Sequence, residues 1–120
     1  MLPSKNRLPG HCFPALLKSK NIYTHPLFTI KFKKKLIQKS VFRAAIVVST
    51  KISKKAVIRN RFKRFFRQSF NLYLSRLNPN YDLLILTKPA IVNKTFSQIK
   101  TALQTALIHT KILKNEKNNP

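Results

Sequence analysis

Apolar and polar residues alternate along residues 26–33, which is the pattern of a β-strand with one buried face. The apolar side, which we assign to the core, consists of Phe28, Ile30 and Phe32. The opposite side consists of Leu27, Thr29, Lys31 and Lys33. Residues 41–49 are rich in β-branched side chains, and residues 82–87 contain a run of aliphatic residues. These two segments predict further strands.

The longest helical pattern covers residues 54–77, between Ser53 as the expected N-cap and the Asn78-Pro79 stop. Its apolar sector on a helical wheel consists of Ile58, Phe62, Phe65, Phe66, Tyr73 and Leu77. A final helix is predicted over residues 95–113, and its inward residues are Ile99, Leu103, Ala106 and Leu107. The order helix, strands, helix, strand, helix predicts an α+β sandwich in which helices pack on one sheet.

The first helix in that order is short and covers residues 12–19, with Phe13, Leu16 and Leu17 along one side. It follows residues 1–10, where proline, glycine and cations predict a basic N-terminal arm. Residues 114–120 predict a disordered polar tail. The length fits one domain, which we place at residues 1–113.

The net charge of the chain indicates which class of partner it binds. The chain has 25 Lys and Arg against two acidic residues, for a formal net charge of +23. Like charges at this density repel as the chain compacts, and nucleic acid is the expected polyanion that offsets the repulsion. The apolar runs are far shorter than the roughly 20 residues of a membrane span, and no secretory signal precedes them. With a lone cysteine, Cys12, we expect a cytoplasmic protein without a membrane partner.

The helix over residues 54–77 carries a cationic sector opposite its phenylalanines. That sector consists of Arg59, Asn60, Lys63, Arg64 and Arg67. No acidic residue occurs between Arg43 and Tyr81 to pair with these cations, and like charges four residues apart on a helix repel. We therefore predict a phosphate-binding face instead of a merely solvated one. Cations beside the N-terminus of the helix extend the same site: Lys51, Lys54 and Lys55.

An aromatic side chain near these cations could stack on an unpaired base. Phe13 is the preferred candidate, although a phenylalanine on a helix is equally well explained as core. Thr29 and Lys31, on the polar side of their strand, could line a groove with it.

Catalytic and metal-binding patterns are missing from the sequence. Nucleases that use metal ions need several converging carboxylates, and this chain has only Asp82, interpreted as a strand-entry residue near surplus cations, and Glu116. The three histidines, His11, His25 and His109, show no metal-ligand spacing. His11 and His25 lie in segments that we expect to be exposed, without an organising partner for acid–base catalysis. We predict no catalytic residue and no metal site in the protein.

Residues 48–67 read VSTKISKKAVIRNRFKRFFR and resemble the signature of the protein component of bacterial ribonuclease P, in which Arg-Asn is followed by Lys-Arg and then Arg. The resemblance extends upstream through Asn6-Arg7-Leu8 and Phe13, and downstream through residues 81–86 and 88–90. It covers nearly the whole chain, and the central motif is its most specific part.

This resemblance implies the fold αβββαβα, a two-layer sandwich with a mixed four-stranded sheet and a left-handed βαβ crossover at the long helix. It requires one more short strand, near residues 20–24. It also implies an endoribonuclease subunit without catalytic residues, whose partners are ribonuclease P RNA and precursor tRNA and which needs no protein partner. The RNA and Mg²⁺ would perform the hydrolysis, with Mg²⁺ bound mainly by the RNA.

On matching positions, the resemblance assigns RNA contacts to Arg59, Asn60, Lys63, Arg64 and Arg67. The cleft for the 5′ leader of precursor tRNA would be bordered by Phe13, Leu17, Thr29 and Lys31. Leu17 and Lys31 stand where the family often has aromatic residues, and Gln68 stands where it commonly has Glu.

Three other functions fit parts of the pattern. A ribosomal protein that binds rRNA, or a nucleic-acid condensing protein, would share the charge and the missing active site. A self-contained ribonuclease would need acid–base residues for which the sequence offers little support. A preference for precursor tRNA that carries its leader separates the ribonuclease P interpretation from the first two.

Overall fold

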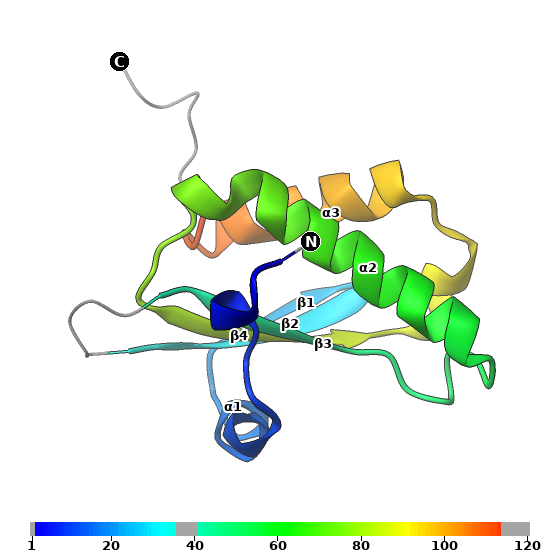
Figure 1. Ribbon diagram of the computed structural model, residues 1–120, viewed down its shortest axis with the longest axis horizontal. Helices are drawn as coiled ribbons and strands as arrows, with labels where there is room; N and C mark the ends of the chain where they lie inside the picture. The colour runs from blue at the N-terminus through cyan, green and yellow to red at the C-terminus, as the bar shows by residue number, and fades with distance from the viewer. Residues whose placement is uncertain (1, 36–40, 114–120) are drawn as a thin grey trace.

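The computed structural model describes residues 2–35 and 41–113, and one mixed sheet forms its centre (Figure 1). The strands are β1 (Ile22–His25), β2 (Phe28–Lys34), β3 (Arg43–Val47) and β4 (Tyr81–Thr87). They lie in the order β1-β2-β4-β3. β2 pairs antiparallel with β1 and β4, whereas β3 pairs parallel with β4. The predicted mixed sheet of four strands is confirmed, and β1 is the additional short strand expected near residues 20–24.

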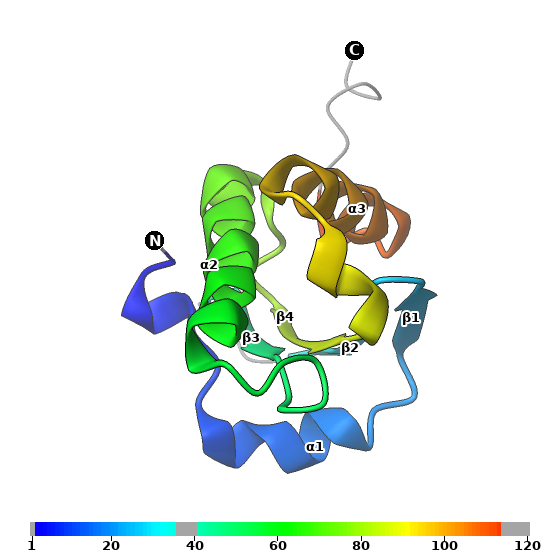
Figure 2. The same ribbon diagram turned by 90° about the vertical axis from the view of Figure 1, so that its right-hand side faces the viewer.

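Three α-helices pack on this sheet: α1 (Phe13–Leu17), α2 (Ala56–Tyr73) and α3 (Phe96–His109). α2 and α3 form a layer on one face, and α1 lies on the opposite face (Figures 1 and 2). α2 carries the chain from β3 to its parallel neighbour β4. If the sheet is viewed from the α2 side with β3 and β4 pointing up, β4 lies to the left of β3 (Figures 1 and 2). The connection β3–α2–β4 is therefore left-handed. The order αβββαβα and the left-handed crossover are therefore as predicted, although such connections are nearly always right-handed.

The start of α2 differs from the prediction. Its N-cap position is Lys55, without a side-chain hydrogen bond. Ser53 instead accepts a hydrogen bond from the Lys55 N–H through its Oγ, at 3.2 Å. The predicted N-cap at Ser53 is therefore wrong, because this residue forms a turn ahead of the helix. The helix also ends earlier, at Tyr73, and a 3₁₀ turn (Leu74–Arg76) leads toward the expected stop.

α3 begins as predicted but ends sooner. The side chain of Thr95 accepts from the Gln98 N–H, and Gln98 accepts from the Thr95 N–H, which completes a capping box. The predicted end at residue 113 is wrong because Lys111 has a left-handed backbone, with φ 65°. The remaining 3₁₀ helices are Ser4–Asn6, Gly10–Cys12 and Pro89–Asn93.

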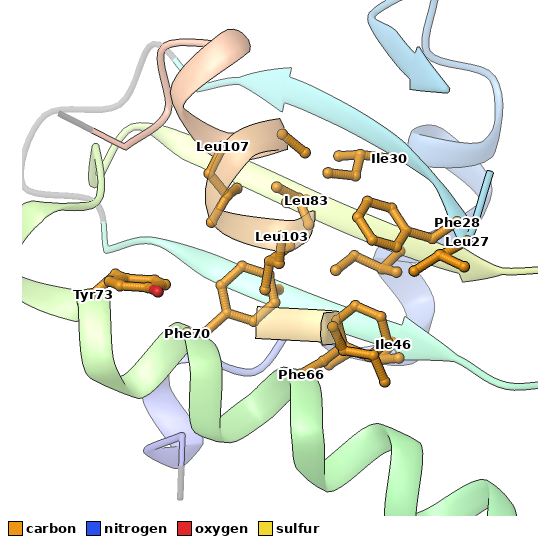
Figure 3. Packing of buried hydrophobic residues seen from close by; sticks show 14 of the residues in the cluster. Leu27, Phe28, Ile30, Ile46, Phe66, Phe70, Tyr73, Leu83, Leu103 and Leu107 are labelled. Atoms are coloured by element: carbon orange, nitrogen blue, oxygen red, sulfur yellow. The ribbon is translucent and has the colours of Figure 1, made fainter. Parts of the chain in front are cut away.

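The main core lies between the sheet and the α2–α3 layer (Figure 3). Its α3 residues are the four predicted ones: Ile99, Leu103, Ala106 and Leu107. Its α2 residues include Phe62, Phe66, Phe70 and Tyr73. Phe66 meets Phe28 of β2 edge to face, with ring centroids 5.7 Å apart. Complete burial of each phenylalanine contributes about 1.5–3 kcal/mol, so this row fixes the rotation of α2 and turns its cations outward.

Two details of the predicted core are wrong, namely the omission of Phe70 and the placement of Leu17. Phe70 is fully buried, although the predicted apolar sector omits it. Ile58, Phe65 and Phe32 are half-buried and pack against the main core, as predicted. On α1, Leu16 is buried, whereas Leu17 is 45% exposed and does not share the inward side.

The N-terminal segment is packed, and it is not the free arm that its composition suggests. Leu2 and Leu8 are buried. The Asn6 amide donates from Nδ2 to the Phe42 carbonyl at 2.7 Å, and the Leu8 N–H donates to the Ala44 carbonyl at 2.9 Å. These bonds hold the segment against β3. The polar tail predicted at residues 114–120 lies outside the described residues.

Candidate nucleic-acid interface

Four of the cations of α2, together with Asn60, lie in two rows along the helix. Arg59, Lys63 and Arg67 follow one another at intervals of four residues and are half-buried. Asn60 and Arg64 are exposed on the surface that points away from the sheet. Burial of the phenylalanine row leaves both rows accessible, so the five predicted residues form one polar side of the helix.

The connection before α2 adds three exposed cations, Lys51, Lys54 and Lys55. Arg59 ties this connection to the helix by donating from Nη1 to the Ser53 carbonyl at 2.8 Å. The first turn of α2 has neither an acidic residue nor a side-chain cap. Its free amide groups and the positive end of the helix dipole therefore face this cluster, which favours an anion.

A pocket of about 340 Å³ lies along the free edge of β3. Lys63 and Arg67 of α2 line one part of it, and Arg7 and Phe13 line another. Residues 44–48 also line the pocket. The fold therefore brings two predicted RNA-binding cations into one site with the preferred stacking residue, from segments far apart in the sequence.

Two guanidinium groups converge on this pocket. Burial, and then the positive charge of Arg7, lower the pKa of Arg67 below its ordinary value. Arg7 is held in place because its Nε donates to the Leu2 carbonyl at 3.0 Å. Since no acidic side chain lines the pocket among the described residues, the pair favours an external anion such as phosphate.

Arg7 is the residue that the sequence argument for the site missed. Its only signal is its position in the Asn6-Arg7-Leu8 element of the family resemblance. Cations in an N-terminal segment carry no periodicity, and the contact with α2 depends on the packing of that segment against β3.

The remaining cleft candidates lie at the far end of α1. Lys31 donates from Nζ to the Leu17 carbonyl at 2.6 Å, so the lysine holds the C-terminus of the short helix. Thr29, on the same side of β2, is half-buried and lies opposite Leu86 in the β2–β4 register. These residues do not line the pocket that contains Phe13.

Aliphatic residues of β3 and β4 lie beside the small cluster beneath α1. Leu86 of β4 is paired with Val47 of β3, and both pack beside the small cluster beneath α1. Both are only half-buried. Thr29 lies opposite Leu86, and Leu86 lies opposite Val47, so these three residues form one row across β2, β4 and β3.

Asp82 is the single acidic residue in the described part of the chain, and it is paired elsewhere. Arg43 donates from Nε to Oδ1 at 2.9 Å and from Nη2 to Oδ2 at 2.7 Å, and Lys35 Nζ lies 2.9 Å from Oδ1. Burial alone would raise the pKa of Asp82, but the hydrogen bonds from Arg43 and Lys35 outweigh it and lower that pKa. Asp82 thus lies at the start of β4 beside cations, as interpreted from the sequence, and it forms a buried ion-pair cluster with two of them.

The histidines are not gathered into a site. His25 accepts a hydrogen bond from the Leu27 N–H at Nδ1, and burial, then Lys88, lowers the pKa of His25. This bond corrects the expectation that His25 has no organising partner. Over residues 2–35 and 41–113, the structure shows no group of three or more His, Cys, Asp or Glu that could hold a metal ion. In the same residues, no helix has the length and apolar character required to cross a bilayer.

Together, the fold and this site define a small α+β protein with a pocket lined by cations at the edge of its sheet. Residues 2–111 match the family described as Ribonuclease P, and the chain belongs to that family. The ribonuclease P protein component of Listeria innocua serovar 6a is 39% identical over 80 residues, which cover 67% of this chain and 66% of the relative. The chain thus spans just under two thirds of that curated relative.

Solved structures give the same result for the fold. A mutant of the Staphylococcus aureus RNase P protein with defective mRNA degradation activity superposes with a TM-score of 0.81 at 25% identity, covering 90% of both chains. The RNase P protein from Thermotoga maritima superposes with a TM-score of 0.76 at 22% identity, covering 86% of this chain and 96% of that one. The left-handed crossover and the mixed sheet therefore belong to the architecture of this family.

Proposed function

We propose that the chain is the protein subunit of ribonuclease P and that it binds both the catalytic RNA and the 5′ leader of precursor tRNA. The observation that carries this proposal is the pocket at the β3 edge. There, Lys63 and Arg67 from the family motif meet Phe13 from the opposite side of the sheet. Cations for phosphates beside an aromatic ring for a base form the combination that recognises a single strand.

The two rows of α2 would bind two different RNAs. The outer row, Asn60 and Arg64, together with the lysines of the connection, faces away from the cleft and suits the backbone of the folded catalytic RNA. The inner row, Lys63 and Arg67, faces the cleft and suits the leader. Arg59 bridges the two surfaces, since its guanidinium is bonded to the connection while its helix position follows the inner row.

Hydrolysis would belong to the RNA and to Mg²⁺ held mainly by the RNA. The described protein residues do not fit a Mg²⁺ site, because Asp82 is their single acid and both of its oxygens accept hydrogen bonds from cations. The protein would instead offset phosphate repulsion and hold the leader in place. Maturation of tRNA 5′ ends by this assembly is a cytoplasmic function.

The leader itself provides the test. Assembled with a bacterial ribonuclease P RNA, the protein should bind precursor tRNA more tightly than the same tRNA without its leader. Phe13→Ala should reduce this difference, whereas Val92→Ala, which truncates an exposed apolar residue in the Pro89–Asn93 turn, should leave it unchanged. Equal affinity for the two tRNAs would favour a ribosomal or condensing protein, which has no reason to distinguish them.

A further inference from the structure

The free edge of β3 presents peptide groups to the pocket. The Ala44 carbonyl accepts from the Leu8 N–H at 2.9 Å, so the peptide groups of Ala44 point away from β4. Because backbone direction alternates along a strand, the N–H and C=O of Ile46 also point away from β4. Val47 points the other way, and its carbonyl accepts from Thr87 Oγ1 of β4 at 3.0 Å.

The N-terminal segment covers only the beginning of this edge. It forms a single bridge between Arg7 and Ala44 and then turns into the 3₁₀ helix Gly10–Cys12. Ile46 as a whole is 7% exposed and its side chain belongs to the main core, so its peptide groups are the part of the residue that lies at the pocket. Within the described residues, neither of these groups has a hydrogen-bond partner.

The groups around the Ile46 peptide indicate which class of ligand fits the pocket. An added peptide strand would find one residue of free edge between the bridge at Ala44 and the strand end at Val47, too little for strand addition. A nucleotide needs a donor and an acceptor for the edge of its base, an apolar surface for the face of the base, and cations for its phosphate. The pocket holds all of these, in Ile46, Phe13 and the convergent pair Arg7 and Arg67.

We propose that the N–H and C=O of Ile46 hydrogen-bond the edge of one unpaired base of the bound RNA, with Phe13 against its face and Arg7 and Arg67 at its phosphate. This inference rests on the proposed function and adds to it the alignment of the leader nucleotides along the protein. Each natural base carries neighbouring donors and acceptors on its pairing edge. The site therefore requires a base at one position of the leader without requiring a particular base, and it fixes which nucleotide lies beside α2.

Two measurements test this assignment. In the first, the holoenzyme binds precursor tRNAs in which each leader position in turn is abasic. One position should weaken binding roughly tenfold, as expected for the loss of one or two hydrogen bonds and a stacking contact, and its neighbours should have little effect. This scan uses the unmodified protein, so it does not depend on the folding of a variant.

In the second, the α-hydroxy analogue of isoleucine replaces Ile46, which changes its N–H to an ester oxygen and keeps the side chain. The abasic effect at the sensitive position should fall from roughly tenfold to about twofold, because the missing donor no longer distinguishes a base from its absence. The matched control is lactic acid, the α-hydroxy analogue of alanine, at Ala45, whose peptide groups point to β4 and whose replacement leaves the N–H and C=O of Ile46 unchanged. It should lower the melting temperature and keep the full abasic effect.

The outcomes separate this inference from the proposed function. Binding that ignores the leader altogether would contradict the proposed function. Leader-dependent binding with the same abasic effect at every position would overturn this alignment of the leader and leave the proposed function standing. A full abasic effect in the Ile46 ester protein would overturn the assignment to the backbone of β3.

Discussion

Replacement of Asp82 by asparagine tests the buried ion-pair cluster. The exposed fractions of the side chains are 11% for Asp82, 12% for Lys35 and 28% for Arg43. Removing one partner of a fully buried pair costs about 3–5 kcal/mol. Arg43 keeps some access to water and asparagine still accepts one hydrogen bond, so we expect a loss of roughly 2–3 kcal/mol. For a chain of this size, that loss lowers the melting temperature by roughly 6–15 °C.

Thermal denaturation followed by circular dichroism at pH 7 measures this loss. Glu116→Gln is the matched control, because it removes the only other acidic residue and raises the net charge by the same amount. Asp82→Asn should melt well below both the unmodified protein and this control. Equal melting temperatures for the two variants would refute the argument, since the effect would then come from net charge alone.

The pH dependence of the same variant supplies a second check. The pKa of Asp82 is lowered in the folded protein, so the unfolded chain binds its proton at higher pH. The stabilisation is therefore complete above the ordinary carboxyl pKa of about 4 and disappears as the pH falls through the lowered value. The stability difference between the unmodified protein and Asp82→Asn should narrow over that acidic range. A difference that stays constant down to strongly acidic pH would show that the ion pair does not cause it.

Three further results are expected. Lys63→Ala should reduce RNA affinity. The slope of log K against log salt should be roughly −3 to −4 for the unmodified protein, and its magnitude should fall by somewhat under one unit in the variant; an unchanged slope would show that Lys63 does not contact RNA. Sulfate should raise the melting temperature, because it neutralises the convergent guanidinium groups of Arg7 and Arg67, and Arg67→Gln should weaken this response; indifference to sulfate would contradict the anion site. Arg59 and Arg64 changed together to Ala should abolish stimulation of the RNA enzyme while the melting transition stays cooperative.

Periodicity predicted the elements whose faces differ in polarity. The alternation around Phe28 and the spacing of Ile99 and Leu103 on α3 gave strands and helices with the correct buried sides. The family motif then supplied what periodicity cannot, namely the order αβββαβα and the left-handed crossover. β1 was expected only from that resemblance, because a strand of four residues with no fully buried side chain carries almost no pattern.

The details that failed depend on contacts between distant segments. Phe70 was omitted because the predicted apolar sector of α2 was too narrow. The residue is buried through contacts with a distant segment, where its ring centroid lies 5.4 Å from that of Phe42, the residue before β3. The ion pairs of Asp82 with Lys35 and Arg43 join three strands and have no local signal. The pocket likewise needs the N-terminal segment on β3, so the sequence identified its cations and Phe13 but not Arg7 or the peptide groups of Ile46.

The location of the chemistry is tested most directly by reconstitution. Precursor tRNA is incubated at low, near-physiological Mg²⁺ with the protein alone, with a bacterial ribonuclease P RNA alone, and with both. We expect no cleavage by the protein alone, and we expect it to increase correct 5′-end cleavage by the RNA, with a smaller increase as Mg²⁺ rises and takes over the screening of phosphates. Robust cleavage by the protein alone, lost when Asp82 or a single histidine is changed, would contradict the account.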